Sequence, residues 1–204
     1  MKKFLCLLLC LFLTACSSAP SASAPSEGWK DKYTDLAKDT VIEAVEKDKL
    51  EAMISHGTCV LFLGFPECPW CQYYLPVLDE VLKENDLNGF YYNIYVHKNE
   101  DAAFYDKIAA LIDEVNDSGE EPLHYNNEGR LVVWMPLTLF IDNGRIVKWD
   151  GESNDLDSSV IAVEDYWTEE KDAALRSRLA EGAALVKKAQ AANGGGCDTG
   201  CKVN

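Results

Sequence analysis

Basic residues are scarce in this sequence of 204 residues. Lysine and arginine together number 19 against 34 aspartates and glutamates, which gives a formal net charge of −15 at pH 7. This balance argues against a surface that binds nucleic acid or anionic lipid. Histidine is also rare: His56, His97 and His124 are scattered, show no ligand spacing relative to the cysteines, and are interpreted as surface or core residues. The sequence has no internal repeat, and its length suits one domain with its own hydrophobic core.

The N-terminal apolar run is too short to span a bilayer. Lys2 and Lys3 precede an apolar stretch at 4–13, whereas a spanning helix needs about 20 residues. This pattern predicts a secretory signal. The stretch ends in Leu-Thr-Ala-Cys at 13–16, which resembles the bacterial lipoprotein box, whose cysteine is diacylated and becomes the first residue of the mature protein. The resemblance implies a signal peptide at 1–15 and lipid on Cys16, hence an extracytoplasmic protein anchored to the bacterial cell membrane; the alternative is an ordinary signal with an incidental Cys16.

The eight cysteines fall into groups. Cys6 and Cys10 lie in the predicted signal, and Cys16 is the predicted lipidation site. The remaining five are Cys59, Cys68, Cys71, Cys197 and Cys201. Disulfides persist outside the cytoplasm. In an exported protein, a cysteine pair separated by two residues therefore indicates redox chemistry in preference to zinc binding.

Hydrophobic periodicity predicts an α/β sandwich. The pattern favours strands at 41–45, 59–65, 90–96, 131–141 and 146–149, and helices at 46–56, 69–85, 101–115 and 168–190. The continuous apolar run at 59–65 is typical of a strand buried on both faces. A polar loop is expected at 117–130 and a hairpin turn at 142–145. We expect a flexible tether at 16–28, a folded domain with a C-terminal helix at 29–191, and a flexible Cys-containing tail at 192–204.

Cys68 and Cys71 carry the predicted chemistry. Cys68 stands where the strand gives way to the helix, and the helix N-terminus favours a thiolate there. Cys71, one turn later, is close enough to form a small disulfide ring. Cys68 would attack a substrate disulfide as the nucleophile and Cys71 would resolve the mixed disulfide; the same pair run in reverse oxidises substrate thiols.

The residues around this pair resemble the thioredoxin family. Cys68-Pro69-Trp70-Cys71 matches its C-x-x-C site, Pro76 matches its kinking helix proline, and Leu78-Asp79-Glu80 follows as in that family. Met135-Pro136 before an apolar strand resembles its cis-proline loop, and the match covers residues 41–151. The resemblance implies a three-layer sandwich with a central mixed sheet flanked by helices. It also implies a cis Pro136 loop facing Cys68 and a Met135 backbone that pairs with substrate; the alternative for Pro136 is a trans proline at a strand start.

One position departs from that family. Thioredoxin has a buried aspartate six residues before the first active cysteine, and this chain has Phe62 there, which puts a fast general reductase in doubt. Glu67 could assist proton transfer from the rim of the site, or it is a solvated charge beside Cys68. The lipoprotein box together with Cys-Pro-Trp-Cys also looks like the bacteriocin-transport accessory proteins, which implies a role in disulfide formation or repair of secreted peptides.

Several residues keep two interpretations. Cys197 and Cys201 follow three glycines and form either a second dithiol that reaches Cys68 and Cys71 or a local disulfide. Cys59 is interpreted as an inert core thiol. Trp70 either shields the disulfide and contacts substrate or packs over the helix start.

The sequence therefore predicts a membrane-anchored thiol–disulfide oxidoreductase acting on exported proteins or peptides. No cofactor is implied, an unidentified membrane or extracellular electron partner is expected, and the protein should act as a monomer. The alternatives are a non-catalytic thioredoxin-like binding or assembly lipoprotein, and zinc held by Cys68, Cys71, Cys197 and Cys201.

Overall fold

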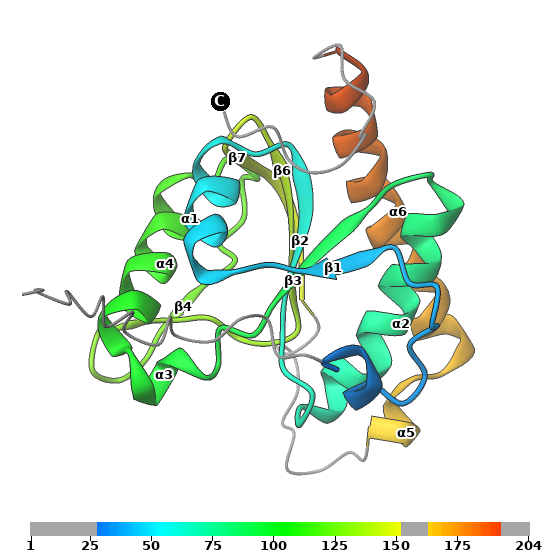
Figure 1. The fold of residues 1–204 in the computed structure, drawn as a ribbon, viewed down its shortest axis with the longest axis horizontal. Helices are drawn as coiled ribbons and strands as arrows, with labels where there is room; N and C mark the ends of the chain where they lie inside the picture. Colours follow the sequence, from blue (N-terminus) through cyan, green and yellow to red (C-terminus); the bar gives the residue numbers. More distant parts are fainter. Residues whose placement is uncertain (1–27, 152–162, 193–204) are drawn as a thin grey trace, which may run out of the picture.

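The computed structural model describes residues 28–151 and 163–192, in which helices cover both faces of one central sheet (Figure 1). The sheet has the strand order β1–β3–β2–β6–β7. Its strands are β1 (Ile42–Ala44), β2 (Cys59–Leu63), β3 (Gly89–Tyr92), β6 (Leu137–Asp142) and β7 (Arg145–Asp150). β3 pairs in parallel with β1 and β2, whereas β6 pairs antiparallel with β2 and β7. A second, two-stranded sheet joins β4 (His124–Tyr125) to β5 (Leu131–Val132).

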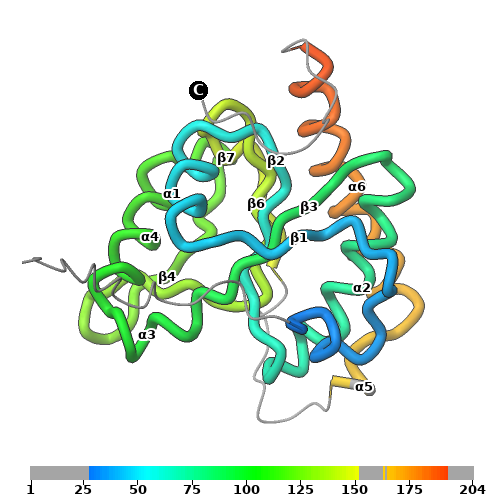
Figure 2. The backbone as a smooth tube through the Cα atoms, in the orientation of Figure 1, coloured from blue at the N-terminus to red at the C-terminus, as the bar shows by residue number. Residues whose placement is uncertain are grey.

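Helices precede, separate and follow these strands along the chain. They are the 3₁₀ turn η1 (Lys30–Lys32), α1 (Lys47–His56), α2 (Pro69–Glu84), α3 (His97–Glu100), α4 (Ala102–Glu114), α5 (Val163–Tyr166) and α6 (Glu169–Ala192). The backbone tube shows α1 and α4 on one side of the sheet and α2 and α6 on the other (Figure 2). The predicted α/β class is therefore confirmed. No helix among the residues described is both long and apolar enough to cross a membrane.

Strand β2 forms the centre of the core because both of its faces are covered. Every residue of this strand is buried. Val60 and Phe62 face the hydrophobic cluster beneath α2 and α6, whereas Cys59, Leu61 and Leu63 face the cluster beneath α1 and α4. Two clusters on opposite faces explain why the sequence reads as a continuous apolar run rather than an alternating one.

Helix α6 approaches the sheet closely at a glycine. A Cβ atom built on Gly182 would lie 2.4 Å from the ring of Phe140, which is fully buried in β6. The missing side chain therefore allows the helix to pack directly on the sheet. Periodicity alone does not predict this contact, since it depends on which strand residue faces the helix.

Two buried carboxylates join elements that are distant in the sequence. Asp79 of α2, which is 1% exposed, accepts hydrogen bonds from the Thr40 hydroxyl at 2.6 Å and the Val41 N–H at 2.8 Å. Asp150 of β7 accepts a bond from the Tyr74 hydroxyl at 2.8 Å and pairs with Arg178 of α6. These contacts hold the beginning of β1 against α2 and the end of β7 against α2 and α6.

The predicted strands at 90–96 and 131–141 differ most from the structure. The strand expected at 90–96 ends at Tyr92, because the Asn93 side chain accepts the Tyr95 N–H at 3.1 Å and turns the chain into α3. The strand expected at 131–141 is divided into β5 and β6, with Pro136 between them. The loop expected at 117–130 contains β4.

Candidate active site

The Cys68–Cys71 pair lies at the junction between β2 and α2. Cys68 is the N-cap residue of α2, and Pro69 opens the helix, a position where a missing N–H costs no hydrogen bond. The Cys71 N–H donates to the Cys68 Sγ at 3.2 Å. A cysteine sulfur thus occupies the place that a serine or aspartate oxygen usually takes at a helix start.

The two thiols have opposite electrostatic environments. A hydrogen bond from the Cys71 side chain, followed by bonds from the backbone of Cys71 and Trp70, lowers the pKa of Cys68 against the opposing effect of burial. Burial raises the pKa of Cys71, and the hydrogen bond to Cys68 and the Cys68 charge raise it further. Negative charge is therefore favoured on Cys68, and the proton stays on Cys71.

Exposure also separates the two sulfurs. Cys68 is 5% exposed, whereas Cys71 is 0% exposed. Gly64 adjoins the inner thiol: a Cβ there would lie 2.5 Å from the Phe62 ring and 3.2 Å from the Cys71 Sγ. Cys68 therefore keeps a small exposed fraction, whereas Cys71 has none.

The register of the sheet brings the Met135–Pro136 loop to the same place. Leu63, the last residue of β2, pairs with Leu137, the first residue of β6. The Met135–Pro136 peptide bond is cis, and the Met135 carbonyl oxygen lies 3.8 Å from the Cys68 Sγ. Met135 is partly buried and Pro136 is buried, whereas Trp134 before them is 51% exposed.

Trp70 packs against rings from the C-terminal part of the chain. Its ring centroid lies 4.9 Å from that of Tyr166 in an edge-to-face arrangement and 6.3 Å from that of Trp167. Tyr73, one turn along α2, stacks on Trp167 at 4.5 Å. Trp70 therefore packs against these rings. It is also partly exposed, and it lies between Cys68 and Cys71 in the sequence.

Phe62 occupies the position expected from the sequence. Its ring is fully buried and stacks between Tyr74, at 5.7 Å, and Tyr91, at 6.1 Å. Glu67, by contrast, is exposed next to Cys68. The aromatic stack therefore fills the space beneath the inner thiol with rings rather than with a carboxylate.

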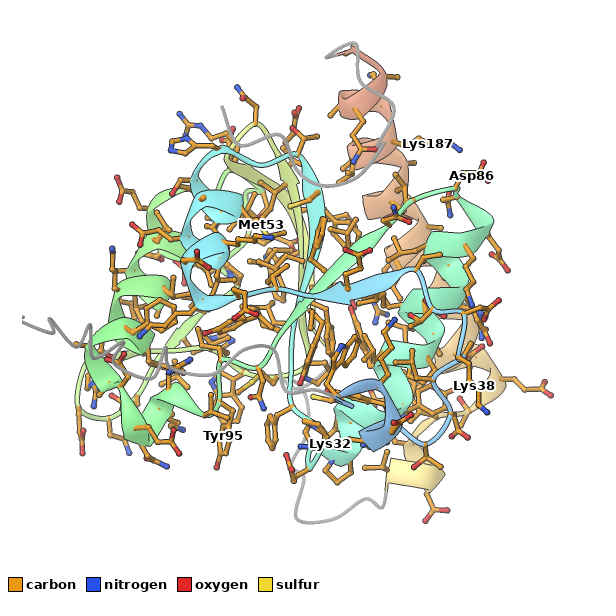
Figure 3. The ribbon with its side chains drawn as sticks, in the orientation of Figure 1. Lys32, Lys38, Met53, Asp86, Tyr95 and Lys187 are labelled. Atoms are coloured by element: carbon orange, nitrogen blue, oxygen red, sulfur yellow. The ribbon has the colours of Figure 1, made fainter. Side chains whose placement is uncertain are left out.

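The structure adds a segment that the sequence analysis left unassigned, residues 29–34, which we call the N-terminal strap. Gln72, directly after Cys71, holds it: the Gln72 side chain accepts the Thr34 N–H at 3.0 Å and donates to the Lys32 carbonyl at 2.8 Å. The same amide donates to the Pro66 carbonyl at 2.6 Å. Figure 3 places Lys32 at the same end of the molecule as Tyr95. The only signal in the sequence was the aromatic pair Trp29 and Tyr33, four residues apart.

The other candidate residues lie apart from this site or outside the residues described. Cys59 is buried at the opposite face of the sheet from Cys71. His97 is buried, with its Nε2 2.7 Å from the Tyr92 hydroxyl, and His56 and His124 are exposed. Within residues 28–151 and 163–192, no group of three or more His, Cys, Asp or Glu side chains could hold a metal ion. Cys16, Cys197 and Cys201 lie outside the described residues.

No family model, curated protein or solved structure matches the chain. The structure nevertheless permits a comparison of architecture. The mixed sheet with flanking helices and the Cys68–Cys71 pair near a helix N-terminus resemble a thioredoxin-like fold. The two cysteines thus form a C-x-x-C pair near the helix N-terminus of such a fold.

Proposed function

We propose that this protein is a membrane-anchored, extracytoplasmic thiol–disulfide oxidoreductase that acts on exported proteins or peptides. The observation that carries the proposal is the difference in exposure and in pKa between the two cysteines. Cys68 keeps a small exposed fraction and has a lowered pKa, whereas Cys71 is fully buried and has a raised pKa. Such a pair suits a nucleophile and a resolving thiol that act in sequence.

In the proposed reaction, the Cys68 thiolate attacks a disulfide of the substrate. A mixed disulfide forms on Cys68, and one substrate sulfur leaves with the electron pair. Cys71 then attacks the Cys68 sulfur, the Cys68–Cys71 disulfide forms, and the second substrate sulfur leaves and takes up a proton. The substrate is reduced and the dithiol oxidised; run in reverse, the same steps oxidise a substrate dithiol.

The Met135–Pro136 loop is the proposed substrate contact. The Met135 carbonyl lies 3.8 Å from the Cys68 Sγ, so its neighbouring backbone is placed to pair with an extended chain bound at the thiol. Trp70 and Pro69 border the same thiol in the sequence. Their proposed role is to shape the approach to Cys68.

The location and partners of the protein rest on the sequence. The apolar run at 4–13 and Leu-Thr-Ala-Cys at 13–16 support export and attachment through lipid on Cys16. An exported dithiol needs an electron partner in the membrane or outside it, and Cys197 with Cys201 is a candidate second pair. The net charge of −15 favours no nucleic-acid partner.

The experiment is to trap the intermediate in cells. Cys71→Ser removes the resolving sulfur, so Cys68 should accumulate mixed disulfides with exported proteins that a reducing agent releases. Adding Cys68→Ala to Cys71→Ser should abolish these adducts, and Cys59→Ser in the Cys71→Ser background should leave them unchanged. If the single variant yields no adducts while the Cys68→Ala, Cys71→Ala double variant retains function, the protein is a non-catalytic binding module.

A further inference from the structure

One side chain joins the N-terminal strap to the turn that precedes Cys68. The Gln72 amide oxygen accepts the Thr34 N–H at 3.0 Å, and the amide nitrogen donates to the Lys32 carbonyl at 2.8 Å. The same nitrogen donates to the Pro66 carbonyl at 2.6 Å. The strap and the turn before Cys68 therefore depend on one side-chain amide.

The backbone of Gln72 contacts the same region. Its N–H donates to the Cys68 carbonyl at 3.1 Å, which is the hydrogen bond with which α2 begins. Cys68 is thus tied to Gln72 through its own carbonyl, and Pro66, two residues earlier, is tied to the Gln72 side chain. These two contacts restrain the backbone on both sides of the Cys68 N–H.

Cys68 needs this restraint because its backbone is not helical. As the N-cap residue it is extended, with φ of −84° and ψ of 113°, and its sulfur accepts the Cys71 N–H at 3.2 Å. A turn delivers the chain to this conformation, closed by the Cys68 N–H and the Phe65 carbonyl at 3.2 Å. A change in the turn would therefore move the sulfur away from the backbone groups that lower its pKa.

The turn also has an anchor that does not involve the strap. The rings of Phe65 and Tyr95 stack with their centroids 4.2 Å apart. Removal of the Gln72 amide therefore leaves the turn attached to the loop that follows β3. The expected consequence is a local change in the turn rather than unfolding.

The strap determines which way the Gln72 amide faces. The Thr34 N–H is a donor and pairs only with the amide oxygen, whereas the Lys32 carbonyl is an acceptor and pairs only with the amide nitrogen. Together they fix the amide in the orientation that offers a second N–H to the Pro66 carbonyl. Undocking of the strap would remove this constraint and leave the amide free to rotate.

We propose that Gln72 is a positioning residue that couples the N-terminal strap to Cys68: the docked strap orients the Gln72 amide, and the amide fixes the turn that holds the Cys68 sulfur at the start of α2. The proposal rests on the proposed role of Cys68 as the nucleophile. It makes docking of the strap a condition for the full reactivity of Cys68. Gln72 itself takes no part in the transfer of protons or electrons.

Two substitutions interrupt the coupling at different places. Gln72→Met keeps the approximate length of the side chain but removes its donors and its acceptor. Thr34→Pro removes the N–H that the amide oxygen accepts. Proline suits this position because Tyr33 before it is extended, with φ of −102° and ψ of 110°, and Thr34 follows Tyr33 in a turn closed by the Leu36 N–H and the Tyr33 carbonyl.

Each substitution has a matched control. Thr34→Ala shortens the same exposed side chain but keeps the N–H. Gln190→Met removes another side-chain amide, which donates to the Thr58 carbonyl at 3.1 Å. Thr58 lies directly before β2, at the opposite end of that strand from Cys68.

The measurement is the rate of iodoacetamide labelling of Cys68 in the reduced full chain across a pH series, with the label located by fragment-ion mass spectrometry. Losing the hydrogen bond to the Pro66 carbonyl weakens the positioned form of the turn by about 2- to 13-fold. Because a less acidic thiolate is a better nucleophile, labelling near neutral pH should slow by about 1.5- to 4-fold in Gln72→Met. Its pH profile should move toward the ordinary pKa of a free cysteine, and neither control should change the rate or the profile.

The double variant distinguishes coupling from a separate structural role. Thr34→Pro alone should slow labelling in the same direction, by no more than Gln72→Met does. It should have no further effect in the Gln72→Met background, because the strap acts through the amide. Equal slowing in both backgrounds, or a wild-type profile in folded Gln72→Met, would overturn the proposal. If Gln72→Met does not fold, identical profiles for Thr34→Pro and Thr34→Ala would overturn it.

Glutathione disulfide separates this proposal from the oxidoreductase function. A wild-type protein whose Cys68 forms no mixed disulfide with glutathione would refute that function, whatever the labelling rates show. A wild-type protein that forms the adduct, with labelling that does not respond to Gln72→Met, would refute the coupling alone.

Discussion

The side chain of Cys71 makes the largest contribution to the lowered pKa of Cys68, and its removal should therefore make Cys68 less reactive near neutral pH. Cys71→Ala deletes this hydrogen bond but keeps the Cys71 N–H, which donates to the Cys68 Sγ at 3.2 Å. The bond from the Trp70 backbone also remains. The variant thus removes one stabilising contact to the thiolate and retains the others.

The magnitude follows from the strength of a charge-assisted hydrogen bond. Such a bond contributes about 1.5–3 kcal/mol, or about 10- to 160-fold in the thiolate population below the pKa. Part of this loss is offset by the greater nucleophilicity of a less acidic thiolate, so alkylation of Cys68 should slow by about 4- to 16-fold. Cys71→Ser keeps a hydroxyl donor at the same position and should slow it less.

The assay is the rate of iodoacetamide labelling of Cys68 across a pH series, measured by peptide mass spectrometry. Because the pKa of Cys68 is lowered, its labelling in the wild type should persist as the pH falls below about 8.5, the ordinary value for a free cysteine. In Cys71→Ala the profile should move toward that ordinary value, with Cys71→Ser between the two. Identical profiles for the wild type and both variants, or a wild-type profile like that of a free thiol, would contradict this account of the site.

Two further predictions concern the scaffold. Asp79→Ala leaves the Thr40 and Val41 donors without their buried acceptor and should lower the free energy of unfolding by about 2–4 kcal/mol in urea titration. Asp39→Ala is the control, because Asp39 is exposed and pairs with Lys83, which also pairs with Asp79. It should leave stability nearly unchanged, and an equal loss in both variants would refute this reasoning. Gly182→Ala should lower the melting temperature because the overpacking, about 1–3 kcal/mol, outweighs the gain of about 1 kcal/mol in helix propensity; a higher melting temperature would contradict the close approach of α6.

The local pattern of the sequence was sufficient for most of the fold. The run at 59–65 predicted a doubly buried strand and the periodicity after Pro69 predicted a helix, and the structure places β2 and α2 there. The local pattern is informative in these segments for a simple reason. A strand buried on both faces gives a continuous run of apolar residues, whereas a helix buried on one face gives apolar residues every three or four positions. The same spacing placed Cys68 at the helix start.

The N-terminal strap could not be predicted in this way. Residues 29–34 have mixed polarity and form only a 3₁₀ turn, so no period reports which face is buried. Their place against α2 depends on side-chain hydrogen bonds from Gln72, about 40 positions later in the chain. Likewise, β3 ended four residues before the hydrophobic pattern did, because a hydrogen bond to the Asn93 side chain competed with the strand ladder.

The sequence by itself determined which sulfur begins the helix and which follows one turn later, because N-terminal position and helical spacing are properties of neighbouring residues. Only the tertiary structure decided what surrounds these sulfurs. The pairing of Leu63 with Leu137 brought the Met135 carbonyl to Cys68, and the Gln72 side chain held residues 29–34 against α2. Contacts between segments so far apart depend on sheet register and on the packing of whole elements, which no local pattern of residues encodes.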